Sequence, residues 1–201
     1  MKKVVITVGR QFGSGGRMIA RRVAEELGIA FYDKELLTRA AKESGISEEL
    51  FHSNDEKPTS SLLYSLAMSN FSGEMPLNHR IFLAQFDVIK KIAAEESCVI
   101  VGRCADYALR DLPHCGHVFI HADLEFRKKR GIEEYGLPPK SAQGIILRTD
   151  KQRANYYNFY TNRKWGSADT YDLSLDSGTI GVDGCVKLIK DFAYIKSEAA
   201  Q

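Results

Sequence analysis

The chain has 201 residues, of which 44% are hydrophobic and 27% charged, and its formal net charge is +2. This length allows one domain with a large core, and the composition is ordinary for a soluble globular protein. The apolar runs are far too short to cross a bilayer, the N-terminus does not read as a signal peptide, and four scattered cysteines argue against a disulfide framework. We therefore expect one cytoplasmic domain over residues 1–201, with neither a membrane nor a nucleic acid as partner.

Short apolar runs alternate with helical patterns along the chain, which is typical of a parallel α/β sheet. Strands are predicted over residues 4–8, 29–32, 98–101, 117–121 and 171–175. Helices are predicted over residues 17–27, 34–43, 47–52, 80–96, 123–135, 140–160 and 182–194. Residues 53–78 show weak periodicity, and we expect them to be partly helical at best. The pattern predicts a three-layer α/β/α fold with about five parallel strands.

A glycine-rich segment, residues 9–17, lies between the first predicted strand and the first predicted helix. Glycines allow backbone N–H groups to turn toward an anion, and the following helix adds its positive N-terminal end. This order of strand, turn and helix is the context of a phosphate loop, whereas a flexible turn is the alternative interpretation. The residues predicted to bind phosphate are Phe12, Gly13, Ser14, Gly15, Gly16 and Arg17.

The segment departs from the usual phosphate-loop pattern G-x-x-x-x-G-K-S/T. If Gly15 is the second glycine, Arg10 stands where the first belongs. Gly16 then replaces the lysine, and Arg17 replaces the Ser/Thr that normally holds magnesium. Arg17 and Arg10 are the candidates to supply the missing charge, although guanidinium and ammonium groups differ in geometry. The departures weaken the case for kinase activity more than the case for phosphate binding.

Polar residues follow two of the predicted strands, at the edge where open α/β sheets bind ligands. The strand over residues 98–101 is followed by Arg103 and Asp106, and Arg103 is a candidate to fork onto a phosphate or a base edge. A surface arginine that caps a helix is the alternative. Asp33 ends the second strand, where it either holds a substrate hydroxyl or base or caps the next helix. We predict a substrate-binding role for Asp33, Arg103 and Asp106.

Residues 127–164 hold ten Lys/Arg and three Asp/Glu, a local excess of +7 that suggests a phosphate-bearing ligand. The arginines predicted to act on a transferred phosphoryl group are Arg127, Arg130, Arg148 and Arg153, together with Arg17 of the loop. The break at residues 131–139 resembles a hinge, so we predict that residues 127–164 form a short helical lid that neutralises transition-state charge. A solvated helix face is the alternative.

Two further groups of residues invite a ligand interpretation. His114, Cys115, His117 and His121 match no zinc spacing, so no metal site is predicted. Residues 156–160 contain three tyrosines and a phenylalanine, and we favour core packing of these rings over stacking on a base.

Taken together, these segments resemble the cytidylate-kinase-like family, a group of the P-loop nucleoside monophosphate kinase type. The resemblance is carried by residues 5–17, 28–33, 99–107, 150–157, 165–166 and 171–175. Through this family the chain is similar to bacterial cytidylate kinases, whose loop binds ATP phosphates and whose strand-end Gly-Arg-Asp contacts CMP. Gly102 and Arg103 match that second motif, with Cys104 in place of its aspartate. The four arginines of residues 127–164 match the lid in type and order.

The resemblance implies ATP-dependent phosphorylation of a nucleoside monophosphate such as CMP or dCMP, with Mg²⁺ bridging donor oxygens. It also implies that residues 53–78 form a helical insertion on the acceptor side. Two alternatives follow from the degenerate loop: a non-catalytic protein that binds nucleotides or anions, and a kinase of another small metabolite.

Overall fold

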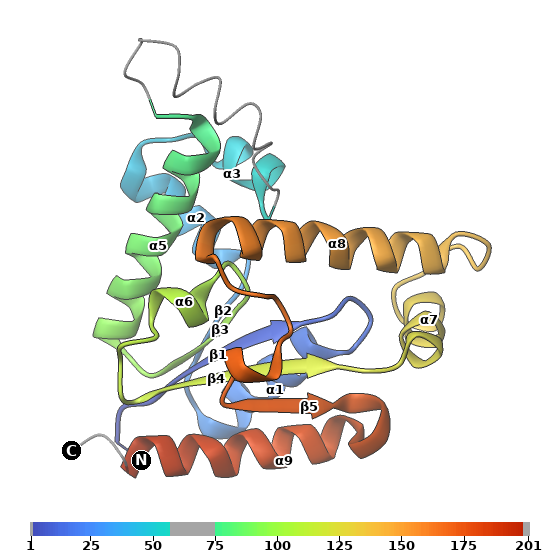
Figure 1. The fold of residues 1–201 in the computed structure, drawn as a ribbon. Helices are drawn as coiled ribbons and strands as arrows, with labels where there is room; N and C mark the ends of the chain where they lie inside the picture. The colour runs from blue at the N-terminus through green and yellow to red at the C-terminus, as the bar shows by residue number, and fades with distance from the viewer. Residues whose placement is uncertain (1, 57–74, 199–201) are drawn as a thin grey trace.

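The computed structural model describes residues 2–56 and 75–198, and its centre is a parallel sheet of five strands (Figure 1). The strands are β1 Val5–Arg10, β2 Ala30–Tyr32, β3 Cys98–Val101, β4 Cys115–His121 and β5 Leu173–Asp176. They lie in the order β2-β3-β1-β4-β5, so β1 occupies the middle of the sheet. The predicted parallel α/β architecture is therefore confirmed.

The middle strand owes its position to a run of apolar residues that can be buried on both faces. Residues 4–8 are fully or almost fully buried, and β1 pairs with β3 on one side and β4 on the other. The strand continues two residues beyond the predicted end, because Gly9 and Arg10 pair with Phe119 and Ile120 of β4. Arg10 thus belongs to the sheet and not to the loop.

The predicted helices begin and end within a few residues of their expected bounds, except at the C-terminus, and α6 and a short 3-10 helix were not predicted. They are α1 Gly16–Leu27, α2 Glu35–Ser44, α3 Glu48–Asn54, α5 Leu77–Glu95, α6 Ala105–Ala108, α7 Leu124–Glu133, α8 Ala142–Thr161, a 3-10 helix at Ala168–Thr170, and α9 Ser177–Glu198. The last helix begins five residues earlier than predicted and contains a break at Gly181, whose φ of 71° is not helical. Of the predicted insertion, residues 57–74 lie outside the described residues.

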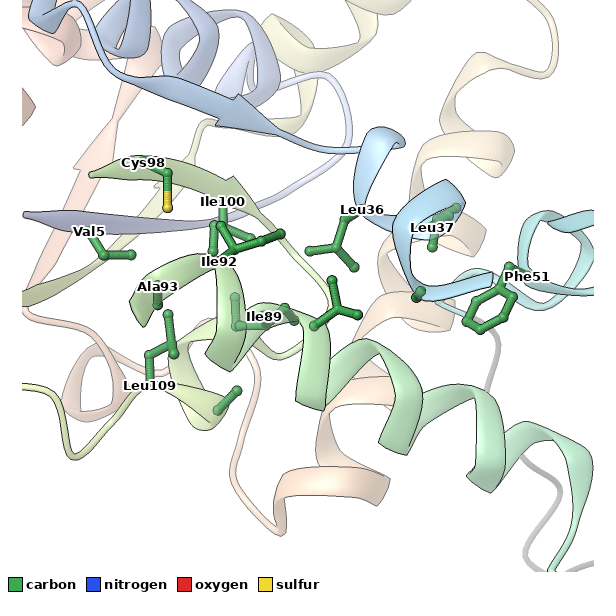
Figure 2. Close-up of a cluster of buried hydrophobic side chains, with 14 of the residues drawn as sticks. Val5, Leu36, Leu37, Phe51, Ile89, Ile92, Ala93, Cys98, Ile100 and Leu109 are labelled. Atoms are coloured by element: carbon green, nitrogen blue, oxygen red, sulfur yellow. The ribbon is translucent and has the colours of Figure 1, made fainter. Parts of the chain in front are cut away.

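Two hydrophobic cores cover the two faces of the sheet. One joins α1 and α9 to the side chains of Val4, Ile6 and Val8. The other joins α2, α3 and α5 to Val5 of β1 and to Cys98 and Ile100 of β3 (Figure 2). Alternate residues of β1 serve opposite cores because successive side chains of a strand point to opposite faces. The predicted three layers are confirmed.

The helices α7 and α8 lie apart from the two cores, at the edge where the strands end. Figure 1 shows α8 crossing above this edge, with α7 next to its amino-terminal end. The segment between them is mostly exposed, and Leu137 anchors it by donating its backbone N–H to the carbonyl oxygen of Gly131. Among the described residues, every helix is too short or too polar to serve as a transmembrane span.

Candidate active site

The turn between β1 and α1 forms a cradle of backbone N–H groups. Gly13 and Gly15 have φ angles of 80° and 77°, which side chains other than glycine rarely adopt. A Cβ at Gly13 would lie 2.7 Å from the carbonyl oxygen of Arg127, and one at Gly15 would collide with the guanidinium of Arg130. Among the contacts of the described residues, the N–H groups of Gly13 and Gly15 have no acceptor. Together with the positive N-terminal end of α1, these features make the turn suitable for an anion.

The loop does not offer a hydroxyl to a metal ion. The Ser14 side chain is fully buried, donates to the Gln11 carbonyl at 2.8 Å and accepts from the N–H of Gly16 at 3.3 Å. Position 17, where a Ser/Thr usually holds magnesium, is Arg17. Within residues 2–56 and 75–198, no three His, Cys, Asp or Glu side chains are grouped so that they could hold a metal. The described side chains therefore fit phosphate groups and form no ready-made group of three metal ligands.

A cavity of about 470 Å³ opens over this loop. Its walls include the loop backbone, Arg10, Arg17, Arg153 and the ring of Tyr135. Tyr135 follows α7 and contacts Phe12 edge-on, with ring centroids 5.8 Å apart. A cavity of this volume is large enough for a small-molecule ligand, and its cationic walls favour a phosphorylated one.

Two arginines of α7 contact the backbone of the loop. Arg127 is buried and forms an ion pair with Asp150 of α8, and it also donates to the Phe12 carbonyl at 3.2 Å. Asp150 in turn accepts the N–H of Phe12 at 2.7 Å. Arg130 donates to the Ser14 carbonyl at 3.1 Å and pairs with Glu134. These contacts attach α7 and α8 to the loop, so Arg127 acts on the loop and not directly on the cavity.

The two predicted arginines of α8 have different surroundings. Arg153 is mostly buried and lines the cavity, donating to Glu56 at 3.2 Å and to the Arg10 carbonyl at 3.3 Å. Arg148 is exposed. Five residues along an α-helix correspond to about 140° of rotation, so the two side chains cannot share a face. The structure thus brings Arg127, Arg130 and Arg153 to the loop and leaves Arg148 on the surface.

The turn after β3 has an unusual backbone. Gly102, Arg103 and Cys104 have successive φ angles of 72°, 55° and 57°, a left-handed conformation that is rare outside glycine. Arg103 is buried and grips Asp55 with two hydrogen bonds of 2.9 and 2.8 Å, while its third donor reaches Asp33 at 3.1 Å. Strained turns of this kind concentrate at functional sites. Arg103 and Asp33, predicted from the sequence as substrate contacts, are thus adjacent.

Two neighbouring acidic residues, Asp55 and Glu56, accept hydrogen bonds from the arginines at this edge of the sheet. Glu56 accepts from Arg10 at 2.7 and 3.2 Å, from Arg153 at 3.2 Å and from the N–H of Arg103 at 3.3 Å. Burial opposes ionisation of Glu56, but the charges of Arg10 and Arg153 hold its pKa well below the ordinary range. For Asp55, burial prevails over the charge of Arg103 and raises the pKa. Sequence reasoning missed both acids, because no local pattern marks residues whose partners lie about 50 positions away.

Asp33 also pairs with Arg17, which draws the half-exposed Arg17 side chain toward the end of β2. Burial again opposes ionisation, and the charges of Arg103, Arg10 and Arg17 nevertheless hold the pKa of Asp33 below its usual value. Asp33 is therefore a fixed anion between two arginines.

Asp106 lies in a different environment from the other predicted substrate contacts. It is buried in α6 and accepts a hydrogen bond of 2.6 Å from the hydroxyl of Tyr157. Burial raises the pKa of Asp106 despite this bond. Tyr156 and Tyr157 are buried as well, which confirms the core interpretation of these two rings. Asp106 is thus a polar member of the packing beneath α8, and it is not among the residues that line the loop cavity.

A sequence model of the cytidylate kinase-like family matches residues 5–179. The chain belongs to the cytidylate kinase-like family. Two curated relatives are named cytidylate kinase: one from Methanopyrus kandleri is 26% identical and covers 93% of this chain and 91% of its own length. The other, from Archaeoglobus fulgidus, is 25% identical and covers 95% of both. Membership of this family supports a phosphotransferase that acts on nucleotides or other small molecules.

Solved structures agree on the fold of this family member. An uncharacterized protein from Eubacterium ventriosum is 32% identical, with a TM-score of 0.72 over 96% of this chain and 99% of that one. Shikimate kinase from Bacteroides thetaiotaomicron shares 13% identity and a TM-score of 0.56 over 95% and 98% of the two chains. At that identity the second likeness concerns the fold alone, which is that of the P-loop kinases.

Proposed function

We propose that this protein transfers the γ-phosphoryl group of ATP to a nucleoside monophosphate, with CMP and dCMP as the first acceptors to test. One observation carries the proposal. A glycine cradle, whose N–H groups have no acceptor among residues 2–56 and 75–198, opens into a cavity walled by arginines, next to an Arg103–Asp33 pair at the neighbouring strand ends. Donor phosphates and an acceptor would then meet at the carboxyl edge of the sheet, where ligands of open α/β sheets bind.

The residues of this chain would act mainly by position and charge. The N–H groups of Gly13 and Gly15 and the first turn of α1 hold donor phosphates, which bring the transferable phosphoryl group. Arg153 faces the same cavity and offsets the negative charge that spreads over the transferred group. Arg103 and Asp33 orient the acceptor: Asp33 accepts hydrogen bonds from it, and the fork of Arg103, which Asp55 holds in this structure, exchanges that carboxylate for the acceptor's phosphate. Mg²⁺ would be held mainly by the donor phosphates and water, since the described residues form no group of three metal ligands.

Two alternatives remain in the test. The absence of a lysine at position 16 favours a protein that binds nucleotides or anions without transferring phosphate. A kinase of another small metabolite would use the same cradle with a different acceptor site. A coupled assay of ADP release, run with ATP and a panel of ribo- and deoxyribonucleoside monophosphates and small alcohols, separates the three.

The assay has a clear expected result. Turnover with CMP or dCMP well above that with the other acceptors supports the proposal, whereas turnover with a non-nucleotide alcohol supports the metabolite kinase. No turnover with any acceptor, combined with measurable ATP binding, supports the binding protein.

A single substitution tests the acceptor assignment. Arg103→Ala should weaken acceptor binding by about 1.5–3 kcal/mol, the range for a lost charge-assisted contact, while changing ATP affinity much less. Equal losses for both ligands would contradict the placement of Arg103 on the acceptor side.

A further inference from the structure

The position of the missing loop lysine is already filled by another side chain. A Cβ built on Gly16 would lie 2.6 Å from the Cβ of Arg10, 3.3 Å from its Cγ and 3.2 Å from the Cβ of Ile120. Real Cβ atoms do not approach each other to 2.6 Å, and neither Cβ can move without its backbone. Position 16 therefore cannot carry a lysine while position 10 carries an arginine.

The path of β1 explains how Arg10 reaches this place. Ile6, Val8 and Arg10 alternate along the strand and point to the face that α1 covers. Since α1 begins only at Gly16, the stem of Arg10 passes beside the first residue of the helix. Its guanidinium lies next to Gly102 at the end of β3, where an added Cβ would collide with Nη1.

The two departures from the usual loop pattern are thus one structural change. The pattern has glycine at the position of Arg10 and lysine at the position of Gly16. Compared with the pattern, this chain carries the larger side chain at the strand position and the glycine at the helix position. A cation remains beside the cradle, because Arg10 lines the loop cavity.

We infer that Arg10 replaces the loop lysine and binds the terminal phosphates of the donor nucleotide, an inference that rests on the proposed function. Pairing does not single out Arg10, because other arginines near the loop also have carboxylate partners; its contact with position 16 does. Arg153 shares Glu56 with Arg10. Arg17 pairs with Asp33, Arg127 with Asp150 and Arg130 with Glu134. Arg10 lines the loop cavity, and its fork is held by the carboxylate of Glu56, a group whose geometry resembles that of a phosphate.

A phosphate-binding role for Arg10 and a purely structural Arg10–Glu56 ion pair lead to different predictions. If Arg10 binds phosphate, Glu56 competes with the ligand for the same guanidinium. Removing the cation and removing the carboxylate then change anion affinity in opposite directions. If the pair merely stabilised the fold, both substitutions would act in the same direction.

The test uses the full chain and inorganic tripolyphosphate, whose binding is measured by calorimetry without any acceptor or turnover. Arg10→Ala and the bulkier Arg10→Gln should each lower the affinity at least tenfold, and Glu56→Gln should raise it severalfold. Arg22→Ala, which removes an exposed cation of α1 paired with Asp183, is the matched control and should bind as the wild type does. Wild-type affinity in the Arg10 variants, or weaker binding in Glu56→Gln, overturns the inference.

A second experiment moves the positive charge from position 10 to position 16. The double variant Arg10→Gly with Gly16→Lys restores both positions of the usual pattern and removes the Cβ contact. It should recover most of the affinity that Arg10→Gly alone loses, and no recovery would overturn the inference. The two claims can fail separately. If the Arg10 variants lose tripolyphosphate binding but the wild type shows no turnover with any acceptor, the proposed function is refuted and the role of Arg10 in anion binding stands.

Discussion

The ion pair between Arg127 and Asp150 should be one of the most sensitive polar contacts of the molecule. The side chains are 7% and 13% exposed, and Asp150 also accepts the N–H of Phe12. Replacing Asp150 by alanine leaves the Arg127 guanidinium buried without its counter-charge, and the Nε of Arg127 already has no acceptor among the described residues. Breaking a buried pair in this way costs about 3–5 kcal/mol. A domain is stable by roughly 5–15 kcal/mol, so the variant should be severely destabilised.

Urea unfolding, followed by the fluorescence of the single tryptophan, Trp165, measures this change. The control is Glu125→Ala, which breaks an exposed pair with Lys128 on the same α7 and should cost about 0–1 kcal/mol. Adding Arg127→Met to Asp150→Ala should recover part of the loss, because the unpaired charge is then removed. If Asp150→Ala and Glu125→Ala cost the same, the pair does not hold α7 and α8 to the loop.

Three further predictions follow from single side chains. Gly15→Ala should lower tripolyphosphate affinity at least tenfold in calorimetry, since the φ of 77° and the guanidinium of Arg130 leave no place for a Cβ. The control is Gly28→Ala, at a φ of 64° with no atom within 4 Å, which should leave this affinity unchanged. The folded-state pKa of Glu56 is depressed, so its stabilising charge is present above the unfolded pKa of about 4.3 and is lost as the pH falls toward the folded value. The wild type should therefore lose part of its advantage over Glu56→Gln in urea unfolding between pH 5 and pH 3, with the rest lost only at still lower pH, and a constant difference would contradict this. Burial raises the pKa of Asp106, so the fold favours its protonated form. As the pH rises from 3 to 7, the free energy of unfolding of the wild type should therefore fall relative to that of Asp106→Asn. A rise relative to Asp106→Asn would show that the fold stabilises the carboxylate.

The fold and the position of the loop followed from local patterns in the sequence. The apolar run at the start of the chain predicted a strand buried on both faces, and β1 lies in the middle of the sheet. The glycines of residues 9–17 predicted a turn whose backbone N–H groups can face an anion, and Gly13 and Gly15 have the positive φ that such a turn uses. Such features are encoded locally, because they depend on backbone sterics and on side-chain periods of two or about four residues. The helix over residues 140–160 was likewise expected, but its direction relative to the loop was not.

The partners of the charged groups were decided by tertiary structure alone. Asp150 is 138 residues from Phe12, and Glu56 is 46 from Arg10, so no periodicity joins them. The sequence showed four arginines in one basic segment, and only the rotation of α8 against the loop separated the buried Arg153 from the exposed Arg148.

The loop shows the same division most clearly. In the sequence, Arg10 and Gly16 look like two independent losses from a phosphate-binding pattern. In the fold, a strand end and a helix start bring these two positions within one Cβ contact, so the side chain gained at one excludes a side chain at the other. Composition and spacing determined that a cation stands near the cradle. Three-dimensional packing decided which residue carries it, because only packing places two backbone segments against the same volume.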